Sequence, residues 1–324
     1  MKSTDIINKL DKAIAANLPA FIWGAPGIGK SSVVEQVAAA RKTDLIDLRV
    51  VLLDPVDLRG LPHIDVKTKT TEWMTPSFLP TKGKGILFLD ELNAAPAMVQ
   101  NACLQLVLNR KLGEYTLPTG WYICAAGNRD TDGALVQRMS SALKSRFIHL
   151  QFDADVNAWC AWGALNGIAP EIIAFLRFRP ELLHKYTKDQ NAFPCPRTWE
   201  YASRLLRVDP QGDYQLLQGT IGEAAAVEFS GFLRMYRDMV SPDAIVANPD
   251  GVPVPTSPGT LYAVATALSH FATAANLKSV TRFLARVPKE YSVLCINDAT
   301  TRDPKLKSTA AYTQWGVLNA ESLY

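Results

Sequence analysis

The chain has 324 residues, and at about 150 residues per domain this length predicts about two domains. Hydrophobic residues make up 48% and charged residues 20% of the sequence, values that argue against a disordered chain, a collagen and a coiled-coil rod. The formal net charge is only +3, and no clustered basic run indicates a nucleic-acid partner.

The five cysteines are scattered along the chain, and none forms a Cys-x-x-Cys pair. This pattern argues against a disulfide framework or a zinc site and fits a reducing compartment. The first 20 residues lack the apolar core and the cleavage site of a signal peptide. No uninterrupted apolar run reaches the roughly 18 residues that cross a bilayer. We therefore expect a cytoplasmic protein with no membrane partner.

Short apolar runs alternate with helix-like stretches in the first half of the chain. The strand-like runs are Ala20–Trp23, Leu45–Leu53, Gly85–Leu89, Trp121–Ala126 and Phe147–Phe152. The helix-like stretches between several of them are Ser31–Arg41, Ala97–Arg110 and Ala134–Lys144. This alternation predicts an α/β domain over residues 1–153, with a five-stranded parallel sheet that helices cover on both faces.

After residue 153 the pattern becomes almost entirely helical. The helix-like segments of residues 154–240 are Val156–Asn166, Glu171–Phe178, Thr198–Leu206 and Ala224–Val240. Ser241–Thr260 carries five prolines, so an irregular, extended connector is predicted there. Further helices are predicted over Leu261–Ala275 and Ser279–Arg286, and Lys305–Tyr324 contains a short amphipathic pattern. Residues 241–324 are therefore expected to form a connector and a helical C-terminal extension.

The segment Gly24–Ser31 reads GAPGIGKS and matches the phosphate-loop pattern G-x-x-x-x-G-K-[ST]. An apolar strand precedes it and a helical stretch follows, as this motif requires. The residues expected to bind the nucleotide are Gly24, Ala25, Pro26, Gly27, Ile28, Gly29, Lys30 and Ser31. The loop wraps phosphates with its backbone N–H groups, Lys30 reaches the β- and γ-phosphates, and Ser31 ligates Mg²⁺.

The segment Ile86–Glu91 reads ILFLDE, a buried strand with two carboxylates at its carboxyl end. Open α/β sheets bind their ligands at that end. We expect Asp90 to bind the nucleotide's Mg²⁺ together with Ser31, and Glu91 to orient the attacking water. The alternative is that the two carboxylates merely begin a surface helix.

With these two motifs the chain resembles an AAA+ ATPase, and three further segments extend the resemblance over roughly residues 15–210. The segment WYICAAGN, which ends in Asn128, is similar to the sensor 1 strand. The segment MSSALKSRF places Arg146 where this superfamily has an arginine finger, and FPCPRTW places Arg197 where it has the sensor 2 arginine. The resemblance therefore implies catalytic roles for Glu91, Asn128, Arg146 and Arg197.

Among AAA+ groups, the resemblance is to the MoxR family. The similar segments are Asp54–Pro62, Glu72–Pro80, Asp90–Pro96 and Arg110–Arg129. The family pattern implies a β-hairpin inserted in helix 2 and a second hairpin before sensor 1. His63–Trp73 alternates polar and apolar residues, as expected for the first hairpin, and Glu114–Pro118 would lie at the top of the second.

Two neighbouring arginines leave alternatives open. Arg138 could be a second finger, a member of a structural ion pair, or a solvated residue. Arg129 could contact a neighbouring subunit, although a solvated arginine is the simpler interpretation. We favour Arg146 as the finger because it directly precedes a predicted strand.

The resemblance implies an AAA+ P-loop αβα sandwich followed by a helical lid domain and a helical C-terminal extension. It also implies ATP–Mg²⁺ hydrolysis in a homo-oligomeric ring, usually a hexamer. The work would be the remodelling or activation of a protein substrate, with a von Willebrand factor A domain protein as the expected partner.

Two other functions compete with this hypothesis. A nucleic-acid-dependent AAA+ motor would need a DNA-binding region, and the sequence shows no basic run or zinc pattern for one. A monomeric P-loop kinase would transfer phosphate to a small molecule without needing a neighbour's arginine.

Overall fold

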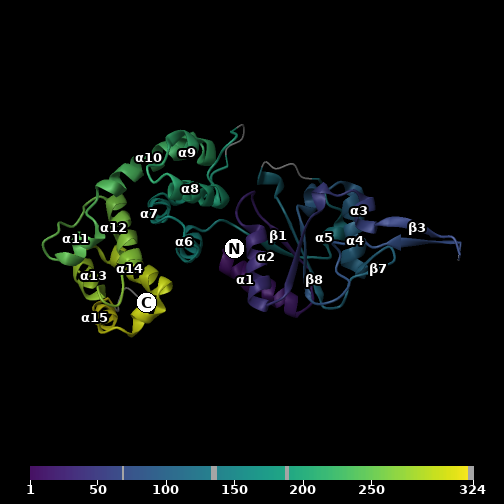
Figure 1. The fold of residues 1–324 in the computed structure, drawn as a ribbon, viewed down its shortest axis with the longest axis horizontal. Coiled ribbons are helices and arrows are strands. Elements are labelled where there is room, and N and C mark those ends of the chain that lie inside the picture. The colour runs from purple at the N-terminus through teal and green to yellow at the C-terminus, as the bar shows by residue number, and fades with distance from the viewer. Residues whose placement is uncertain (68, 133–136, 187–189, 320–324) are drawn as a thin grey trace. The chain divides into compact units, whose positions relative to one another are not determined.

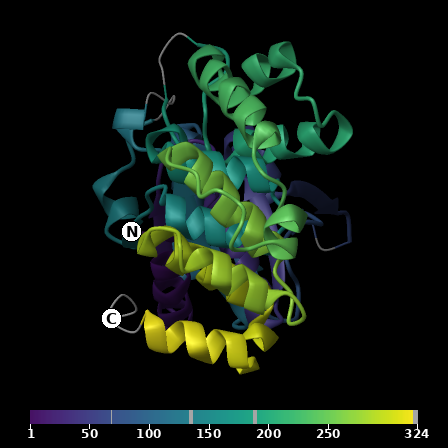
Figure 2. The same cartoon turned by 90° about the vertical axis from the view of Figure 1, so that its left-hand side faces the viewer.

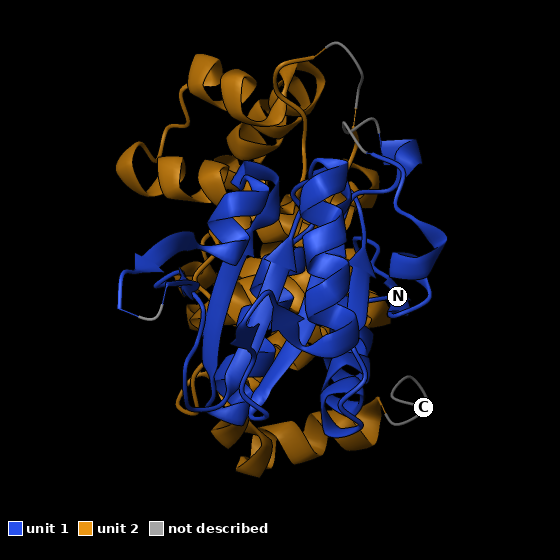
Figure 3. Cartoon of the chain, turned by 90° about the vertical axis from the view of Figure 1, so that its right-hand side faces the viewer, with its two compact units in different colours: residues 1–154 blue, residues 155–324 orange. Residues whose placement is uncertain are grey.

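The computed structural model describes residues 1–67, 69–132, 137–186 and 190–319. These residues form two compact units, one within residues 1–154 and one within residues 155–324, which Figure 3 draws in different colours. Each unit is described by itself below. The expected separation of residues 154–240 from residues 241–324 stays a prediction.

The first unit is built on a parallel sheet (Figure 1). Among the described residues, five strands form this sheet in the order β2-β5-β8-β1-β9. They are β1 (Ala20–Trp23), β2 (Asp44–Arg49), β5 (Gly85–Asp90), β8 (Trp121–Gly127) and β9 (Ile148–Gln151). Every pairing in the sheet is parallel. The predicted fold class is confirmed: an α/β sandwich followed by a helical region.

Helices cover both faces of this sheet because its strands alternate their apolar side chains. In β5, Ile86 and Phe88 pack in one hydrophobic cluster, and Leu87 and Leu89 pack in another. The first cluster includes side chains of α1 (Ser3–Ala15) and α2 (Lys30–Arg41). The second includes side chains of α4 (Ala97–Asn109) and of the short α5 (Ser141–Lys144). Successive side chains of a strand point to opposite faces, which explains this division.

Two predicted elements of this unit are much shorter than expected. β2 ends at Arg49, because Val50–Leu52 turn into a 3₁₀ helix that leaves Leu52 exposed. The helix predicted over Ala134–Lys144 begins only at Ser141. The hydroxyl of Ser140 accepts a hydrogen bond from the backbone N–H of Leu143 and so caps the helix there. Residues 134–136 of that prediction lie outside the described residues.

Both predicted hairpins are present. β3 (Leu61–Asp65) pairs antiparallel with β4 (Thr70–Met74), and this hairpin extends away from the sheet (Figure 1). The short helix α3 (Pro55–Arg59) precedes it, and the Arg59 guanidinium lies over the Trp73 ring at 4.9 Å.

The second hairpin pairs β6 (Lys111–Leu112) with β7 (Tyr115–Thr116). Glu114 lies in its turn, and its carboxylate accepts a hydrogen bond from Trp73 N at 3.4 Å. This contact joins the two hairpins. Two further 3₁₀ turns of the unit are η2 (Leu92–Ala94) and η3 (Asp130–Asp132).

The second unit consists of helices in its described part, coloured teal to yellow in Figure 2. They are α6 (Val156–Leu165), α7 (Pro170–Phe178), α8 (Pro196–Val208), α9 (Tyr214–Ile221), α10 (Glu223–Asp238), α11 (Pro242–Ala247), α12 (Pro258–Phe271), α13 (Leu277–Leu284), α14 (Lys289–Arg302) and α15 (Ala310–Leu318). Short 3₁₀ turns cover Pro180–Leu182 and Pro304–Ser308. In the chain as described, no helix combines the length and the apolar character needed to cross a membrane.

The prediction of an extended connector over Ser241–Thr260 is wrong at both of its ends. Ser241 caps α11, and Pro242 is the first residue of that helix. Ser257 caps α12 in the same way, with Pro258 first in the helix. Proline is favoured at this position because its fixed φ suits a helix and its missing N–H would have no partner there.

A buried ion pair joins two helices of the second unit that are far apart in sequence. Arg177 of α7 donates to Asp298 of α14 through both terminal nitrogens, with a distance of 2.7 Å from Nη2 to Oδ1. The two side chains are 6% and 14% exposed. His270, at the end of α12, carries a charge interaction with both of them.

Candidate active site

The sequence-predicted site residues of the first unit, apart from Arg146, gather at the carboxyl ends of three neighbouring strands. The loop Gly24–Gly29 follows β1. Asp90 is the last residue of β5, Glu91 follows it, and Asn128 follows β8. Because the order of these strands is β5-β8-β1, their carboxyl ends lie side by side at one edge of the sheet.

Buried side chains anchor the loop, and its last residue has a left-handed backbone conformation. Ala25 and Ile28 are buried in the cluster that also contains α2. Gly29 caps α2 with a φ of 97°, a conformation that a side chain would strain. Gly24 N donates to Gly127 O at 3.2 Å, which ties the start of the loop to the end of β8. The loop therefore places the N–H groups of the helix start at this edge of the sheet.

Lys30, the first residue of α2, spans the loop. Its ammonium donates to Gly24 O at 2.7 Å, to Ala25 O at 3.1 Å and to Asn128 Oδ1 at 2.7 Å. The side chain thus connects the phosphate loop to the residue predicted as sensor 1. An ammonium in this position can bind the phosphates of a nucleotide.

Ser31 and Asp90 lie close enough to share a cation. Ser31 Oγ donates to Asp90 Oδ2 at 3.1 Å. Desolvation, and next the negative charge of Asp90, raises the pKa of Asp47 on β2. A hydroxyl and a carboxylate oxygen are ligands that Mg²⁺ prefers, so the residues present fit this ion.

Glu91 has an unusual backbone. Its φ is 56°, in the left-handed region, and its N–H donates to Asp90 Oδ1 at 2.9 Å. Its carboxylate has no hydrogen bond to any residue that the structure describes. The side chain is therefore available at the end of β5, as a residue that orients water requires.

Asn128 is held by a residue that the sequence did not single out. Asn93 Nδ2 donates to Asn128 O at 2.7 Å, and Asn128 N donates to Asn93 Oδ1 at 3.2 Å. Asn93 is only 2% exposed. A Cβ on Gly127 would lie 2.1 Å from Asn93 Oδ1, so glycine is required there. The position of Asn93 three residues after Asp90 was visible in the sequence, but its partner lies 35 residues away.

Arg129 and Arg138 have different surroundings. Arg129 Nη2 donates to Phe152 O and to Asp153 Oδ1, both at 2.6 Å. This arginine is thus engaged within its own chain. Arg138 is exposed and forms no ion pair or hydrogen bond with the described residues.

Arg146 lies away from the residues above. It is exposed, and it precedes β9, whose first residue Ile148 pairs with Ala20, the first residue of β1. The phosphate loop follows the other end of β1. Arg146 therefore belongs to the amino ends of the parallel strands, whereas Lys30 and Asp90 belong to the carboxyl ends. Its side chain has one hydrogen bond to a described residue, a 3.4 Å contact from Nη1 to Ser145 Oγ.

A chain of hydrogen bonds runs from the phosphate loop towards Arg146. Trp23, which directly precedes the loop, donates from Nε1 to His149 Nδ1 at 2.8 Å. Because Nδ1 accepts this bond, His149 Nε2 carries the proton and donates to Lys144 O at 2.9 Å. Lys144 is the last residue of α5, two positions before Arg146.

Arg197 belongs to the second unit. It is the second residue of α8, follows Pro196, and is exposed. The helix begins with a capping arrangement in which Cys195 N donates to Thr198 Oγ1 at 2.8 Å. A role for Arg197 towards a nucleotide therefore stays a prediction.

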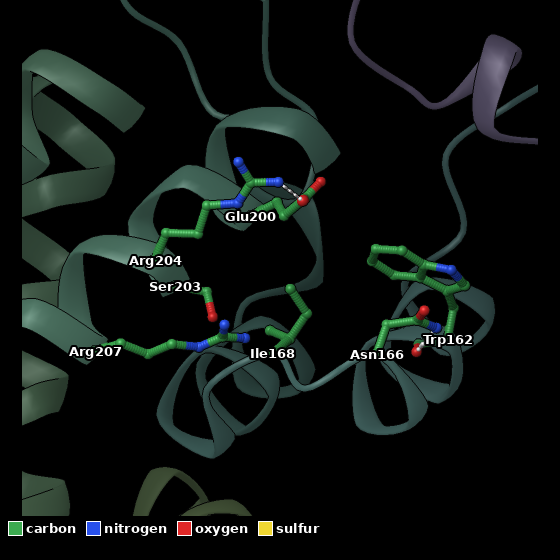
Figure 4. Close-up of a pocket in the computed structure, with 7 residues that line it drawn as sticks. All are labelled: Trp162, Asn166, Ile168, Glu200, Ser203, Arg204 and Arg207. Atoms are coloured by element: carbon green, nitrogen blue, oxygen red, sulfur yellow. Dashed lines mark hydrogen bonds and ion pairs between the residues drawn. The ribbon is translucent and has the colours of Figure 1, made fainter.

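A hollow of about 230 Å³ lies in the second unit (Figure 4). Its lining residues are Trp162, Asn166, Ile168, Glu200, Ser203, Arg204 and Arg207. Both arginines already have partners: Arg204 pairs with Glu200, and Arg207 donates to Gly167 O. The described residues contain no cluster of His, Cys, Asp or Glu that could hold a metal ion by itself.

Solved structures with a similar fold come from several bacteria. A candidate ATPase from Cytophaga hutchinsonii is 14% identical, with 97% of this chain and 88% of that chain covered and a TM-score of 0.37. NtrX from Brucella abortus is 14% identical, with 98% and 68% covered and a TM-score of 0.44. A RuvB mutant from Thermotoga maritima is 16% identical, with 76% and 79% covered and a TM-score of 0.42. These similarities are too distant to indicate a function.

A family match covers most of the first unit. Residues 19–147 match the family described as AAA domain (dynein-related subfamily). No curated protein matches the chain. The matched segment contains the phosphate loop, Asp90, Glu91 and Asn128, and it supports nucleotide binding and an ATPase activity. Residues 19–147 of the first unit are thus similar to an AAA domain, and the residues gathered at the carboxyl ends of β1, β5 and β8 lie within this segment.

Proposed function

We propose that this chain is a MoxR-like AAA+ ATPase that hydrolyses ATP in a homo-oligomeric, hexameric ring and so remodels or activates a protein partner. The observation that carries the ATPase part is the hydrogen-bonded set of Lys30, Ser31, Asp90 and Asn128 at one edge of the sheet. These four residues come from three different segments, and each has the chemistry that phosphoryl transfer to water requires.

In the proposed reaction, Lys30 binds the β- and γ-phosphates, and the loop N–H groups hold the phosphate oxygens. Ser31 and Asp90 would hold Mg²⁺, which neutralises charge on the phosphates when it is bound. Glu91 orients the attacking water, and Asn128 contributes a second polar contact to it. Nucleotide binding draws Lys30 from its backbone acceptors towards the phosphates.

The position of Arg146 supports a site that is completed between subunits. The residue is exposed and lies at the amino end of an edge strand, so it cannot be grouped with its own phosphate loop. A finger supplied by a neighbouring subunit would place a positive charge on the γ-phosphate. In the same scheme Arg197, which belongs to the helical unit, contacts the nucleotide. It thereby couples phosphate release to a change in the orientation of the helical unit.

The protein partner is proposed from the resemblance to the MoxR family. That family pattern implies two hairpins, and the hairpins β3–β4 and β6–β7 support the proposal. A von Willebrand factor A domain protein is the expected partner. The nucleic-acid motor stays the alternative.

The test uses the purified chain. ATP hydrolysis should depend on Mg²⁺ and should fall when the protein is diluted below the concentration at which light scattering shows a ring. Single- and double-stranded DNA should leave the rate unchanged, whereas strong stimulation by DNA would favour the motor. A tagged Glu91→Gln variant with ATP should retain its protein partner, and the tagged Lys30→Ala variant should not. Hydrolysis by monomers at high dilution would contradict the ring.

A further inference from the structure

We propose that Asn93 is a positioning residue for ATP hydrolysis, and that it acts by fixing the backbone of Asn128. This inference rests on the proposed function. Its basis is a pair of hydrogen bonds, because Asn93 Nδ2 donates to Asn128 O at 2.7 Å and Asn93 Oδ1 accepts from Asn128 N at 3.2 Å. One side-chain amide thus satisfies both polar groups of one residue's backbone.

The two bonds replace sheet pairing at a point where the sheet has ended. The last paired residues of β5 and β8 are Leu89 and Ala125. Beyond them, Glu91 turns away from the sheet with its φ of 56°. Asn128 therefore has no neighbouring strand to hold its N–H and C=O groups. The amide of Asn93 offers a donor and an acceptor in the same plane, as a paired peptide group would.

The site around Asn93 is built for this contact. The side chain is 2% exposed, so solvent cannot replace its hydrogen bonds. Gly127 leaves the space that Asn93 Oδ1 occupies, since a Cβ there would lie 2.1 Å away. The backbone of Asn93 is used as well, because its C=O accepts from Gln137 N at 2.7 Å. These contacts leave Asn93 little freedom to move.

The consequence for the reaction follows from the next contact. Asn128 Oδ1 accepts from Lys30 Nζ at 2.7 Å. With the backbone of Asn128 fixed, the only freedom left to this residue is rotation of its own side chain. Asn128 can then exchange Lys30 for the attacking water without a shift of its backbone. A displacement of about 1 Å at such a group can reduce a rate about a hundredfold.

Gln100 provides a matched control for Asn93. It is also a buried amide, 4% exposed, and its Nε2 donates to Ala95 O at 3.0 Å. It lies on α4 in the same unit and has no hydrogen bond to Asn128. A loss of stability alone would therefore affect Gln100→Ala and Asn93→Ala in similar ways.

The experiment is a double-mutant cycle on kcat for ATP hydrolysis. Asn93→Ala should lower kcat by about tenfold to a hundredfold and leave KM nearly unchanged, because it misplaces Asn128 without touching the phosphate loop. In an Asn128→Ala background the same substitution should lower kcat by no more than about twofold, since the side chain that Asn93 positions is then absent. Gln100→Ala should leave kcat near the wild-type value in both backgrounds.

A second variant keeps the test valid if Asn93→Ala does not fold. Asn93→Asp retains the acceptor for Asn128 N but loses the donor to Asn128 O. Protonation of the introduced carboxyl restores that donor. The rate of this variant relative to wild type should therefore rise as the pH falls from about 8 to about 6. The rise should be absent when Asn128→Ala is also present.

The outcomes separate this role from the proposed function. Additive losses in the cycle, or a flat relative pH profile, overturn the role of Asn93 while ATP hydrolysis by the wild type still supports the proposed function. A wild-type protein that does not hydrolyse ATP overturns both.

Discussion

Lys30 Nζ and Asn128 Oδ1 lie 2.7 Å apart, although 98 residues separate them in the sequence. The contact exists because β8 pairs directly with β1, so the residue after β8 meets the first residue of α2. It brings the lysine predicted to bind phosphate and the predicted sensor into one hydrogen-bonded unit. The predictions below begin with this lysine.

Lys30→Ala should abolish nucleotide binding, because Lys30 is the ammonium group placed on the phosphate loop. Titration with a fluorescent ATP analogue measures this directly. Lys9→Ala, which removes an exposed lysine of α1, should bind as the wild type does. Near-normal affinity of Lys30→Ala would show that the loop does not bind the phosphates.

Glu91→Gln should bind ATP normally and hydrolyse it at least about a hundredfold more slowly, the usual effect of losing a group that activates water. The amide keeps the size of the side chain but removes its negative charge. Single-turnover hydrolysis measures the chemical step separately from product release. Glu72→Gln, an exposed residue of β4, is the matched control. A wild-type rate of hydrolysis by Glu91→Gln would show that another residue orients the attacking water.

Arg146→Ala should bind ATP but lose most hydrolysis, since a finger supplied by a neighbour can contribute about 10³–10⁵ in rate. Mixing this variant with Lys30→Ala should restore part of the activity, because some sites then combine an intact Lys30 with an intact Arg146. Lys144→Ala, a nearby exposed cation at the end of α5, should retain activity. No recovery in demonstrated mixed rings would contradict action between subunits.

The second unit should lose stability in mildly acidic solution because of His270. Burial, and next the positive charge of Arg302, lowers the pKa of His270 below its usual 6.5; Arg177 acts in the same direction and Asp298 opposes it. The unfolded chain therefore takes up a proton before the folded chain does. The free energy of unfolding should be highest above about pH 6.5 and fall as the pH drops below it.

Urea unfolding between about pH 7.5 and pH 5.5 tests this window, which lies above the range where most carboxylates titrate. His270→Gln should flatten the dependence, and His63→Gln, at an exposed position of β3, should not. If the free energy of unfolding of His270→Gln still fell with pH as in the wild type, the pH dependence would arise from other groups.

Arg177→Ala should destabilise the second unit by about 3–5 kcal/mol, because it leaves the Asp298 carboxylate buried without its partner. Replacing both residues at once, as Arg177→Met with Asp298→Leu, should cost much less. Urea unfolding followed by far-ultraviolet circular dichroism, to which the helices of this unit contribute, measures both. Equal losses in the single and the double variant would contradict an uncompensated charge as the cause.

The sheet was predictable because its strands are short runs rich in apolar residues that alternate with helical stretches. All five predicted strands are present, and Ala20–Trp23 has the expected bounds. The helix α14 was missed because its buried face includes Ser292, Cys295 and Thr300, which weaken the apolar periodicity. The prolines of Ser241–Thr260 were misread because proline stops a helix from within but is favoured as its first residue.

The site was predictable where a motif fixes the spacing and unpredictable where only the fold brings residues together. Lys30, Ser31 and Asp90 follow from local patterns. Asn93 gives no comparable signal, because its contact with Asn128 depends on the pairing of β5 with β8. The same holds for His149, which reaches Trp23 only because β9 pairs with β1.

If Glu91 has its proposed role, its left-handed backbone makes the stability of the fold and the rate of ATP hydrolysis depend in opposite ways on one position. A side chain in this conformation lowers the free energy of unfolding by about 1 kcal/mol, and a glycine at this position would remove that loss. The Glu91 carboxylate forms no hydrogen bond to the described residues that would offset this loss of stability. Laboratory evolution of this chain for heat resistance alone should therefore drift towards glycine here and yield a more durable protein without turnover. Only a screen that also demands ATP hydrolysis would keep the glutamate.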